Sequence, residues 1–145
     1  MGDETRTGRC LCGAVSVRAR LVNGEIMLCH CRQCQQWTGG GPLMSVDVSG
    51  LEIKGTDHIA HHHASEWGDR AFCRECGSTL YWAMRGKPTR SIAVGLLDDQ
   101  SGLRVTDEIF VDHRPGWLPR WPDAAQSTQA QEFEKLTKVL SGDEP

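Results

Sequence analysis

The sequence predicts a mainly antiparallel β fold that ends in one helix and is held together by bound metal. Most segments of the 145-residue chain have the two-residue apolar period of half-buried strands, and only one segment near the end has a helical period. Seven cysteines in closely spaced motifs are the third observation, because an odd number of thiols cannot pair completely within one chain. A chain of this length is most simply one domain, covering residues 1–145.

The predicted strands follow one another through most of the chain. The first covers residues 13–21, where Val15, Val17 and Ala19 alternate with polar side chains. The other strand candidates are bounded by glycine, proline, aspartate or serine and cover residues 43–48, 51–54, 79–83, 91–97 and 109–111.

A helix is predicted over residues 123–141. Asp123 can cap its first turn, and Gln126 stands in the position of a capping-box partner. The apolar stripe of this helix is expected to cover one face of the sheet, and it consists of Phe133, Leu136, Val139 and Leu140.

Charge and hydropathy argue against several kinds of partner. No apolar run resembling a signal peptide follows Met1, and no stretch approaches the roughly 18 apolar residues of a membrane helix. We therefore expect a cytoplasmic protein with no membrane partner, whose thiols stay reduced and bind metal. The formal net charge is -3 and no lysine or arginine run is present, which argues against nucleic acid as a partner.

Four of the cysteines are predicted to form a closed zinc site. Cys73 and Cys76 have the spacing of a zinc knuckle, and Gly77 supplies the permissive backbone that such turns need. A CxxC pair also occurs in redox dithiols, but no βαβ context surrounds this one. Cys10 and Cys12 precede a predicted strand, where extended backbone places both side chains on the same side. Four thiolates complete a tetrahedral zinc, which is typical of a structural site.

The remaining three cysteines are predicted to form an open zinc site. Cys29 and Cys31 lie on one side of an extended segment while His30 points away, and Cys34 follows Cys31 at knuckle spacing. Three ligands leave one corner for a substrate, and an anionic three-thiolate zinc favours thiol chemistry. Such a zinc is also more labile than one held by four thiolates.

The alternative for this second cluster is a closed site, completed by a distant histidine or aspartate. The available histidines are His58, His61, His62, His63 and His113. The run from His58 to His63 is itself interpreted as a hydrophilic edge strand or turn, because at most two of its side chains share a face.

The cysteine motifs resemble those of the glutathione-dependent formaldehyde-activating enzyme family, which includes centromere protein V. The segments that carry the resemblance are Gly8 to Val15, Cys29 to Gly39 and Arg70 to Leu80. The resemblance covers a core of roughly residues 5–121 and implies an Mss4-like β-rich fold with two zinc ions per chain. It implies a structural zinc on Cys10, Cys12, Cys73 and Cys76, and a catalytic zinc on Cys29, Cys31 and Cys34. Glu108 departs from the pattern, because many members of the family carry a histidine there.

The resemblance also implies a reaction. Members named for their activity condense formaldehyde with glutathione to S-(hydroxymethyl)glutathione, which is carbon-sulfur lyase chemistry. We therefore expect a zinc-dependent enzyme acting on glutathione or another thiol and a small carbonyl. Glutathione has two carboxylates, so arginines near the motifs are predicted to bind the substrate. They are Arg32, Arg70, Arg74 and Arg114.

Two other classes of function stay open at this stage. A binding module of Mss4-like fold would use both zinc ions structurally and present a surface to a protein partner. A redox enzyme of the methionine-sulfoxide-reductase type would need a free nucleophilic cysteine, and all seven cysteines are already assigned to metal motifs. The sequence contains no signal for an oligomeric state.

Overall fold

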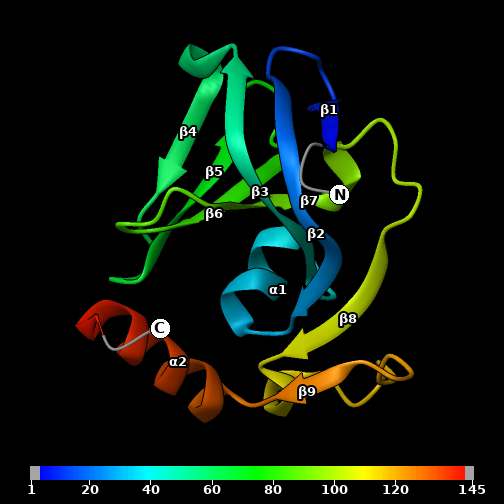
Figure 1. The fold of residues 1–145 in the computed structure, drawn as a ribbon, viewed down its shortest axis with the longest axis vertical. Helices are drawn as coiled ribbons and strands as arrows, with labels where there is room; N and C mark the ends of the chain where they lie inside the picture. The colour runs from blue at the N-terminus through cyan, green and yellow to red at the C-terminus, as the bar shows by residue number, and fades with distance from the viewer. Residues whose placement is uncertain (1–3, 143–145) are drawn as a thin grey trace. The chain divides into compact units, whose positions relative to one another are not determined.

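Antiparallel strands make up most of the regular structure, which is a computed structural model describing residues 4–142 (Figure 1). The mainly β, Mss4-like fold class with a C-terminal helix is therefore confirmed. The chain falls into two units. Unit 1 contains the residues up to Ile26 and Met44–Arg104, and unit 2 contains Met27–Leu43 and the residues from Val105 onward. The single 1–145 domain stays a prediction.

Unit 1 is a sheet with the strand order β4-β5-β6-β7-β3-β2, and β1 pairs with β2 (Figure 1). Strand β7 pairs with β3 and β6, and β5 pairs with β4 and β6, all antiparallel. The strands are β1 Thr5–Arg9, β2 Ser16–Cys29, β3 Leu43–Lys54, β4 Ile59–His62, β5 Gly68–Cys73, β6 Thr79–Met84 and β7 Arg90–Ala93. The last residues of β2 and the first residue of β3, Leu43, belong to unit 2.

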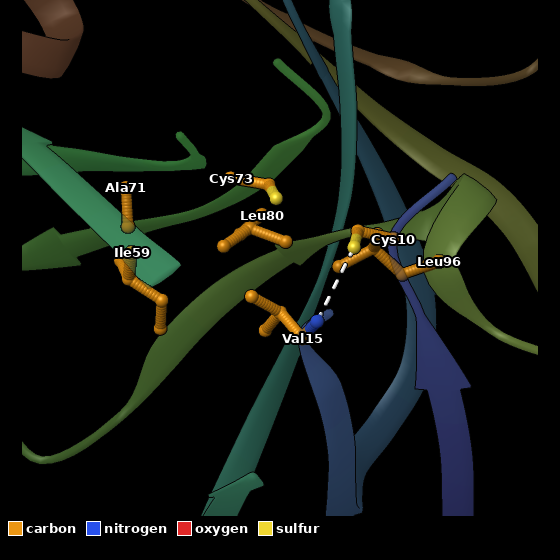
Figure 2. Packing of buried hydrophobic residues seen from close by; sticks show 7 residues of the cluster. All are labelled: Cys10, Val15, Ile59, Ala71, Cys73, Leu80 and Leu96. Carbon is orange, nitrogen blue, oxygen red and sulfur yellow. Dashed lines mark hydrogen bonds between the residues drawn. The ribbon is translucent and has the colours of Figure 1, made fainter. Parts of the chain in front are cut away.

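The alternation predicted for the first strand is confirmed by burial. Val15, Val17 and Ala19 are buried, whereas Arg18 and Arg20 are exposed. The buried side chains form two apolar clusters in unit 1. The first contains Cys10, Val15, Ile59, Ala71, Cys73, Leu80 and Leu96, all shown in Figure 2. The second contains Ala19, Leu21, Val46, Val48, Ile92, Val94 and Leu97. Two of the predicted ligand cysteines are therefore part of the core.

Two glycines allow backbones to approach each other beside the first cysteine motif. A Cβ on Gly55, whose φ is 87°, would lie 1.9 Å from the carbonyl oxygen of Ala14. A Cβ on Gly8 would lie 2.3 Å from the carbonyl oxygen of Leu96. Only glycine fits at either position, and this close contact on both sides fixes the backbone that carries Cys10 and Cys12.

Unit 2 contains the end of β2, helix α1 Arg32–Thr38, strand β8 Arg104–Ile109 apart from its first residue, strand β9 Ala125–Ser127 and helix α2 Gln129–Ser141. Strands β8 and β9 are parallel. In the part of the chain that is described, no helix is long and apolar enough to cross a membrane.

The predicted helix starts later than expected. Residue 123 was the expected cap, but Asp123 has a φ of 64° and Ala125–Ser127 pairs with β8 as a strand. Helix α2 is capped instead by Thr128, whose capping box is completed by Gln131. The start at residue 123 is therefore wrong, because strand pairing takes the residues that local capping signals assigned to the helix.

The expected covering of a sheet face by α2 is also wrong. Helix α2 contains no buried residue. Phe133 and Leu140 are 39% and 51% exposed, and Phe133 packs edge to face against Phe110 with ring centroids 5.9 Å apart. The apolar stripe is therefore only partly covered.

Several strand boundaries differ from the sequence prediction. The segments 43–48 and 51–54 join into the single strand β3. Strand β7 ends at Ala93, and Val94–Leu96 is a 3₁₀ turn. The expected strand over 109–111 is wrong, because Phe110 has a left-handed φ of 58° and Val111–His113 is another 3₁₀ turn. Helix α1 was not predicted, since its seven residues, about two turns, contain too few apolar residues for a helical period.

Candidate metal centres

The four cysteines predicted to form a closed site converge in unit 1. Every pair of their sulfur atoms lies within 4.8 Å. The Sγ atoms of Cys10 and Cys12 are 3.6 Å apart, and those of Cys12 and Cys73 are 3.8 Å apart. A tetrahedral zinc with Zn–S bonds of about 2.3 Å separates its sulfurs by about 3.8 Å. The cluster of Cys10, Cys12, Cys73 and Cys76, here called the four-cysteine cluster, can therefore bind a metal ion of this kind.

Local backbone geometry places these sulfurs. Cys10 follows β1, Cys73 ends β5, and Cys76 lies in the turn before β6. This turn closes by a 2.8 Å hydrogen bond from the N–H of Gly77 to the carbonyl of Cys73, with a φ of 79° at Gly77. The knuckle predicted from the spacing is therefore present in the structure.

The four thiols do not ionise alike. The hydroxyl and the backbone N–H of Ser78 lower the pKa of Cys76 to about 5. The backbone N–H of Ala14 favours ionisation of Cys12, but burial and the three neighbouring thiols outweigh it and raise the pKa of Cys12 to about 12. Sulfurs this close cannot all carry charge without a cation among them, and a divalent metal would supply that charge.

The other three cysteines converge in unit 2, and Cys29, Cys31 and Cys34 are here called the three-cysteine cluster. Their sulfurs lie within 4.8 Å of one another. Cys29 ends β2, and Cys31 caps α1 by accepting a 3.3 Å hydrogen bond from the N–H of Cys34. Cys29 and Cys34 are buried, whereas Cys31 is half-buried. Hydrogen bonding among the three thiols, together with burial, raises the pKa of Cys29. This set also fits a thiophilic metal ion.

No fourth ligand joins the three-cysteine cluster among residues 4–142. The histidines considered for this role have other neighbours or are exposed: His58 lies near Glu75, His61 near Tyr81, His63 near Asp69 and His113 near Gln129. His62 is exposed on β4. The cluster thus offers three sulfurs, as the motif spacing predicted.

His30 points away from the cysteines and into a buried polar network. It is 0% exposed, and its Nε2 lies 2.7 Å from Oε1 of Glu108. Oε2 of Glu108 accepts hydrogen bonds from the backbone N–H of Trp121 at 2.8 Å and from Nε2 of Gln126 at 2.7 Å. Arg114 donates to the same oxygen at 3.2 Å.

Glu108 is ionised within this network. Burial opposes the charge, but the hydrogen bonds from Gln126, Trp121 and His30 and the positive charge of Arg114 together lower its pKa to about 2. Sequence reasoning noticed Glu108 only as a departure from a family pattern. Nothing in local spacing could reveal its role, because its partner His30 is 78 positions away.

The four arginines predicted to bind substrate lie in different units. Arg32 is exposed in the first turn of α1 and donates to Oε1 of Gln35, and Arg114 is paired with Glu108. Arg70 is buried in β5 of unit 1, and Arg74 lies inside the knuckle, where it donates to the carbonyl of Ile59. Only Arg32 and Arg114 therefore share a unit with the three-cysteine cluster. Substrate binding by all four stays a prediction.

The fold and the two clusters define a β-rich protein that can bind two metal ions through cysteine. Residues 5–113 match the model of the family described as glutathione-dependent formaldehyde-activating enzyme. The chain belongs to this family, which confirms the resemblance drawn from the three cysteine motifs.

Two curated relatives have names that concern an activity. One, from Schizosaccharomyces pombe, is named an uncharacterized lyase and is 26% identical over 110 residues, which cover 74% of this chain and 80% of the relative. The other, from Halomonas elongata, is named "Putative glutathione-dependent formaldehyde-activating enzyme" and is 33% identical over 85 residues. That match covers 51% of this chain and 53% of the relative.

The crystal structure of a Rhodobacter sphaeroides protein has a similar fold, with a TM-score of 0.57 and 22% sequence identity. The match covers 69% of this chain and 99% of that structure. This likeness concerns the fold alone.

Proposed function

We propose that the chain is a zinc-dependent carbon-sulfur lyase-like enzyme that joins glutathione or another thiol to a small carbonyl such as formaldehyde. Its family and the names of its relatives support a glutathione-related, lyase-like function at a coarse level. The observation that carries the proposal is the three-cysteine cluster, which gathers three sulfurs without a fourth ligand among residues 4–142.

Each cluster has a separate role in this proposal. Zinc on the four-cysteine cluster joins β1, β2 and the β5–β6 turn and is structural. Cys29, Cys31 and Cys34 would hold the second zinc, which would lower the pKa of a substrate thiol and so favour its nucleophilic thiolate. Cys31, the half-buried member, leaves the cluster accessible, while Leu43, Ile109 and Phe110 pack against it and limit water. A reducing compartment such as the cytoplasm suits these ligand thiols.

The reaction balances without any further reactant. The sulfur of the thiol bonds to the carbonyl carbon, and the electron pair of the carbonyl π bond moves to the oxygen. The proton lost by the thiol ends on that oxygen, and the product is a hemithioacetal. With glutathione and formaldehyde this product is S-(hydroxymethyl)glutathione. We propose that Arg32 and Arg114 attract the carboxylates of glutathione, as guanidinium groups suit carboxylates. Arg114 already shares its charge with Glu108, so Arg32 is the more available of the two.

The proposal is tested by mixing the zinc-loaded protein, glutathione and formaldehyde and following adduct formation by exchange NMR. We expect the adduct to form faster than in the same mixture without protein. Cys31→Ser should remove the acceleration while one zinc per chain remains bound at the four-cysteine cluster. A rate equal to the uncatalysed one with fully zinc-loaded protein would overturn the proposed activity.

A non-catalytic binding module remains the second candidate, favoured by apolar side chains that unit 2 leaves exposed. Trp117 is 71% exposed and Leu140 is 51% exposed. In such a module both metals are structural. Replacement of zinc by cobalt distinguishes the two, because added glutathione changes the visible spectrum of an open cobalt site and leaves two closed sites unchanged.

A further inference from the structure

His30 is fixed at three points within unit 2. Its ring Nε2 is bonded to Glu108 at 2.7 Å. Its backbone N–H donates to the carbonyl of Ile109 at 3.0 Å, and its carbonyl accepts a 2.8 Å hydrogen bond from Nε2 of Gln35. The ring is 0% exposed. Because His30 stands between Cys29 and Cys31, these bonds determine the direction in which both neighbouring side chains leave the backbone.

Glu108 is the anchor of this arrangement. It is 1% exposed, and besides His30 it accepts from Arg114, Gln126 and the backbone of Trp121. Its charge is balanced by the guanidinium of Arg114, 3.2 Å away. A buried carboxylate with partners on both oxygens has one stable orientation, since turning it would leave several donors without an acceptor.

The carboxylate also determines which ring nitrogen of His30 carries the proton. An ionised carboxylate only accepts, so Nε2 of His30 donates to it. The other nitrogen, Nδ1, is buried and has no hydrogen-bond partner. A glutamine at position 108 has two orientations: its N–H faces Nε2 of His30 and the ring proton moves to Nδ1, where no acceptor exists, or its N–H faces the donors of Arg114, Trp121 and Gln126. Even this conservative change therefore disturbs the position of His30.

We propose that Glu108 is a positioning residue of the three-cysteine cluster and holds the sulfurs of Cys29 and Cys31 in place for the metal through His30. The inference rests on the proposed function only in requiring that this cluster binds a metal ion. Glu108 is not among the residues whose ligand atoms converge in the cluster, and it acts through its bond to His30. Glu108 keeps the two sulfurs in their binding positions in the metal-free protein. Metal binding therefore does not have to order the segment from Cys29 to Cys34.

The test measures metal affinity rather than turnover. Purified full-length protein is loaded with Co²⁺ or Zn²⁺, and the second metal is removed by titration with a chelator while the first serves as an internal reference. Glu108→Gln should weaken binding of the second metal by about 10- to 100-fold, the usual effect of losing a group that orients a ligand. The cobalt–thiolate absorption of the second site should also change, which a general loss of stability does not cause.

A double-mutant cycle tests whether Glu108 affects metal affinity through His30. His30→Leu should weaken the second metal by a similar factor, and Glu108→Gln should cause no further loss in the His30→Leu background. Glu132→Gln is the matched control, because Glu132 lies in the same unit and its carboxylate accepts from Ser127 and Lys135. It should leave both metals unchanged.

Four outcomes count against the inference. Unchanged affinity for the second metal in Glu108→Gln overturns it. An equal loss of this affinity from Glu108→Gln in the wild-type and His30→Leu backgrounds also overturns it, because Glu108 would then act without His30. If Glu108→Gln does not fold, His30→Leu decides alone, and full retention of the second metal by that variant overturns the inference. A wild-type protein that binds only one metal overturns the proposed function instead, and the inference falls with it.

Discussion

The two cysteine clusters should differ sharply in what they contribute to stability. The four-cysteine cluster joins Cys12 to Cys73 across 61 positions, whereas the three-cysteine cluster spans only Cys29 to Cys34. A metal link restricts the unfolded chain more when the loop that it closes is longer. The chain-entropy relation used for disulfides gives about 4 kcal/mol for a loop of about 60 residues and about 2 kcal/mol for a loop of about five.

We therefore expect Cys73→Ser to lower the free energy of unfolding by about 4 kcal/mol, a large part of the 5 to 15 kcal/mol typical of a domain. Cys31→Ser should cost about 2 kcal/mol or less, because its loop is short and Cys31 is half-buried. The assay is urea unfolding of the zinc-loaded proteins at one fixed concentration of free zinc. Hydrogen exchange read by mass spectrometry then reports units 1 and 2 separately.

The strands in which amide exchange accelerates distinguish the effect of loop length from a general effect of losing metal. Cys73→Ser should accelerate amide exchange in β5 and β6, while Cys31→Ser should leave those strands protected. If Cys31→Ser destabilises the whole protein as much as Cys73→Ser does, loop length does not decide the contribution of a cluster, and the reasoning is refuted.

Three further changes have specific expected results. Gly55→Ala places a Cβ 1.9 Å from the oxygen of Ala14 and should cost about 3 kcal/mol or more in urea unfolding, whereas Gly102→Ala, with a similar φ but open space, should cost about 1 to 2 kcal/mol. Equal losses would contradict the clash. The pKa of Glu108 is about 2 in the fold, against 4.5 for an ordinary glutamate. Its ionised form therefore contributes about 3 kcal/mol to the free energy of unfolding, and this contribution is complete above pH 4.5 and lost as the pH falls through 2. A carboxyl NMR titration with a midpoint near 4.5 would contradict this. Thr128→Ala should cost about 1 kcal/mol and speed amide exchange in the first turn of α2 without releasing metal; unchanged exchange would show that the cap is dispensable.

The cysteine clusters could be predicted because their geometry is largely local. Two cysteines three apart meet across a turn, and two cysteines two apart meet on an extended strand, whatever the rest of the chain does. Gly77 after Cys76 and the short distance from Cys31 to Cys34 were sufficient to indicate a knuckle in each cluster. The same local period correctly assigned the buried face of β2.

The network behind the three-cysteine cluster could not be predicted, because its members are far apart in the sequence. Gln126 has the spacing of a capping partner for Asp123, yet its amide donates to Glu108 and the helix starts at Gln129. Local signals compete with long-range hydrogen bonds at such positions, and the buried carboxylate of Glu108 decides the outcome. No spacing rule relates residue 126 to residue 30.

By itself, the sequence determined the β-rich class and the two sets of predicted ligand cysteines, since both follow from periods of two and three residues along the chain. Tertiary structure alone decided how closely the two distant cysteine pairs approach, with Sγ of Cys12 3.8 Å from Sγ of Cys73, and that His30 turns to Glu108. The physical reason is that segments far apart in the sequence meet only when the strands between them are buried together, and the free energy of that burial is a property of the whole fold.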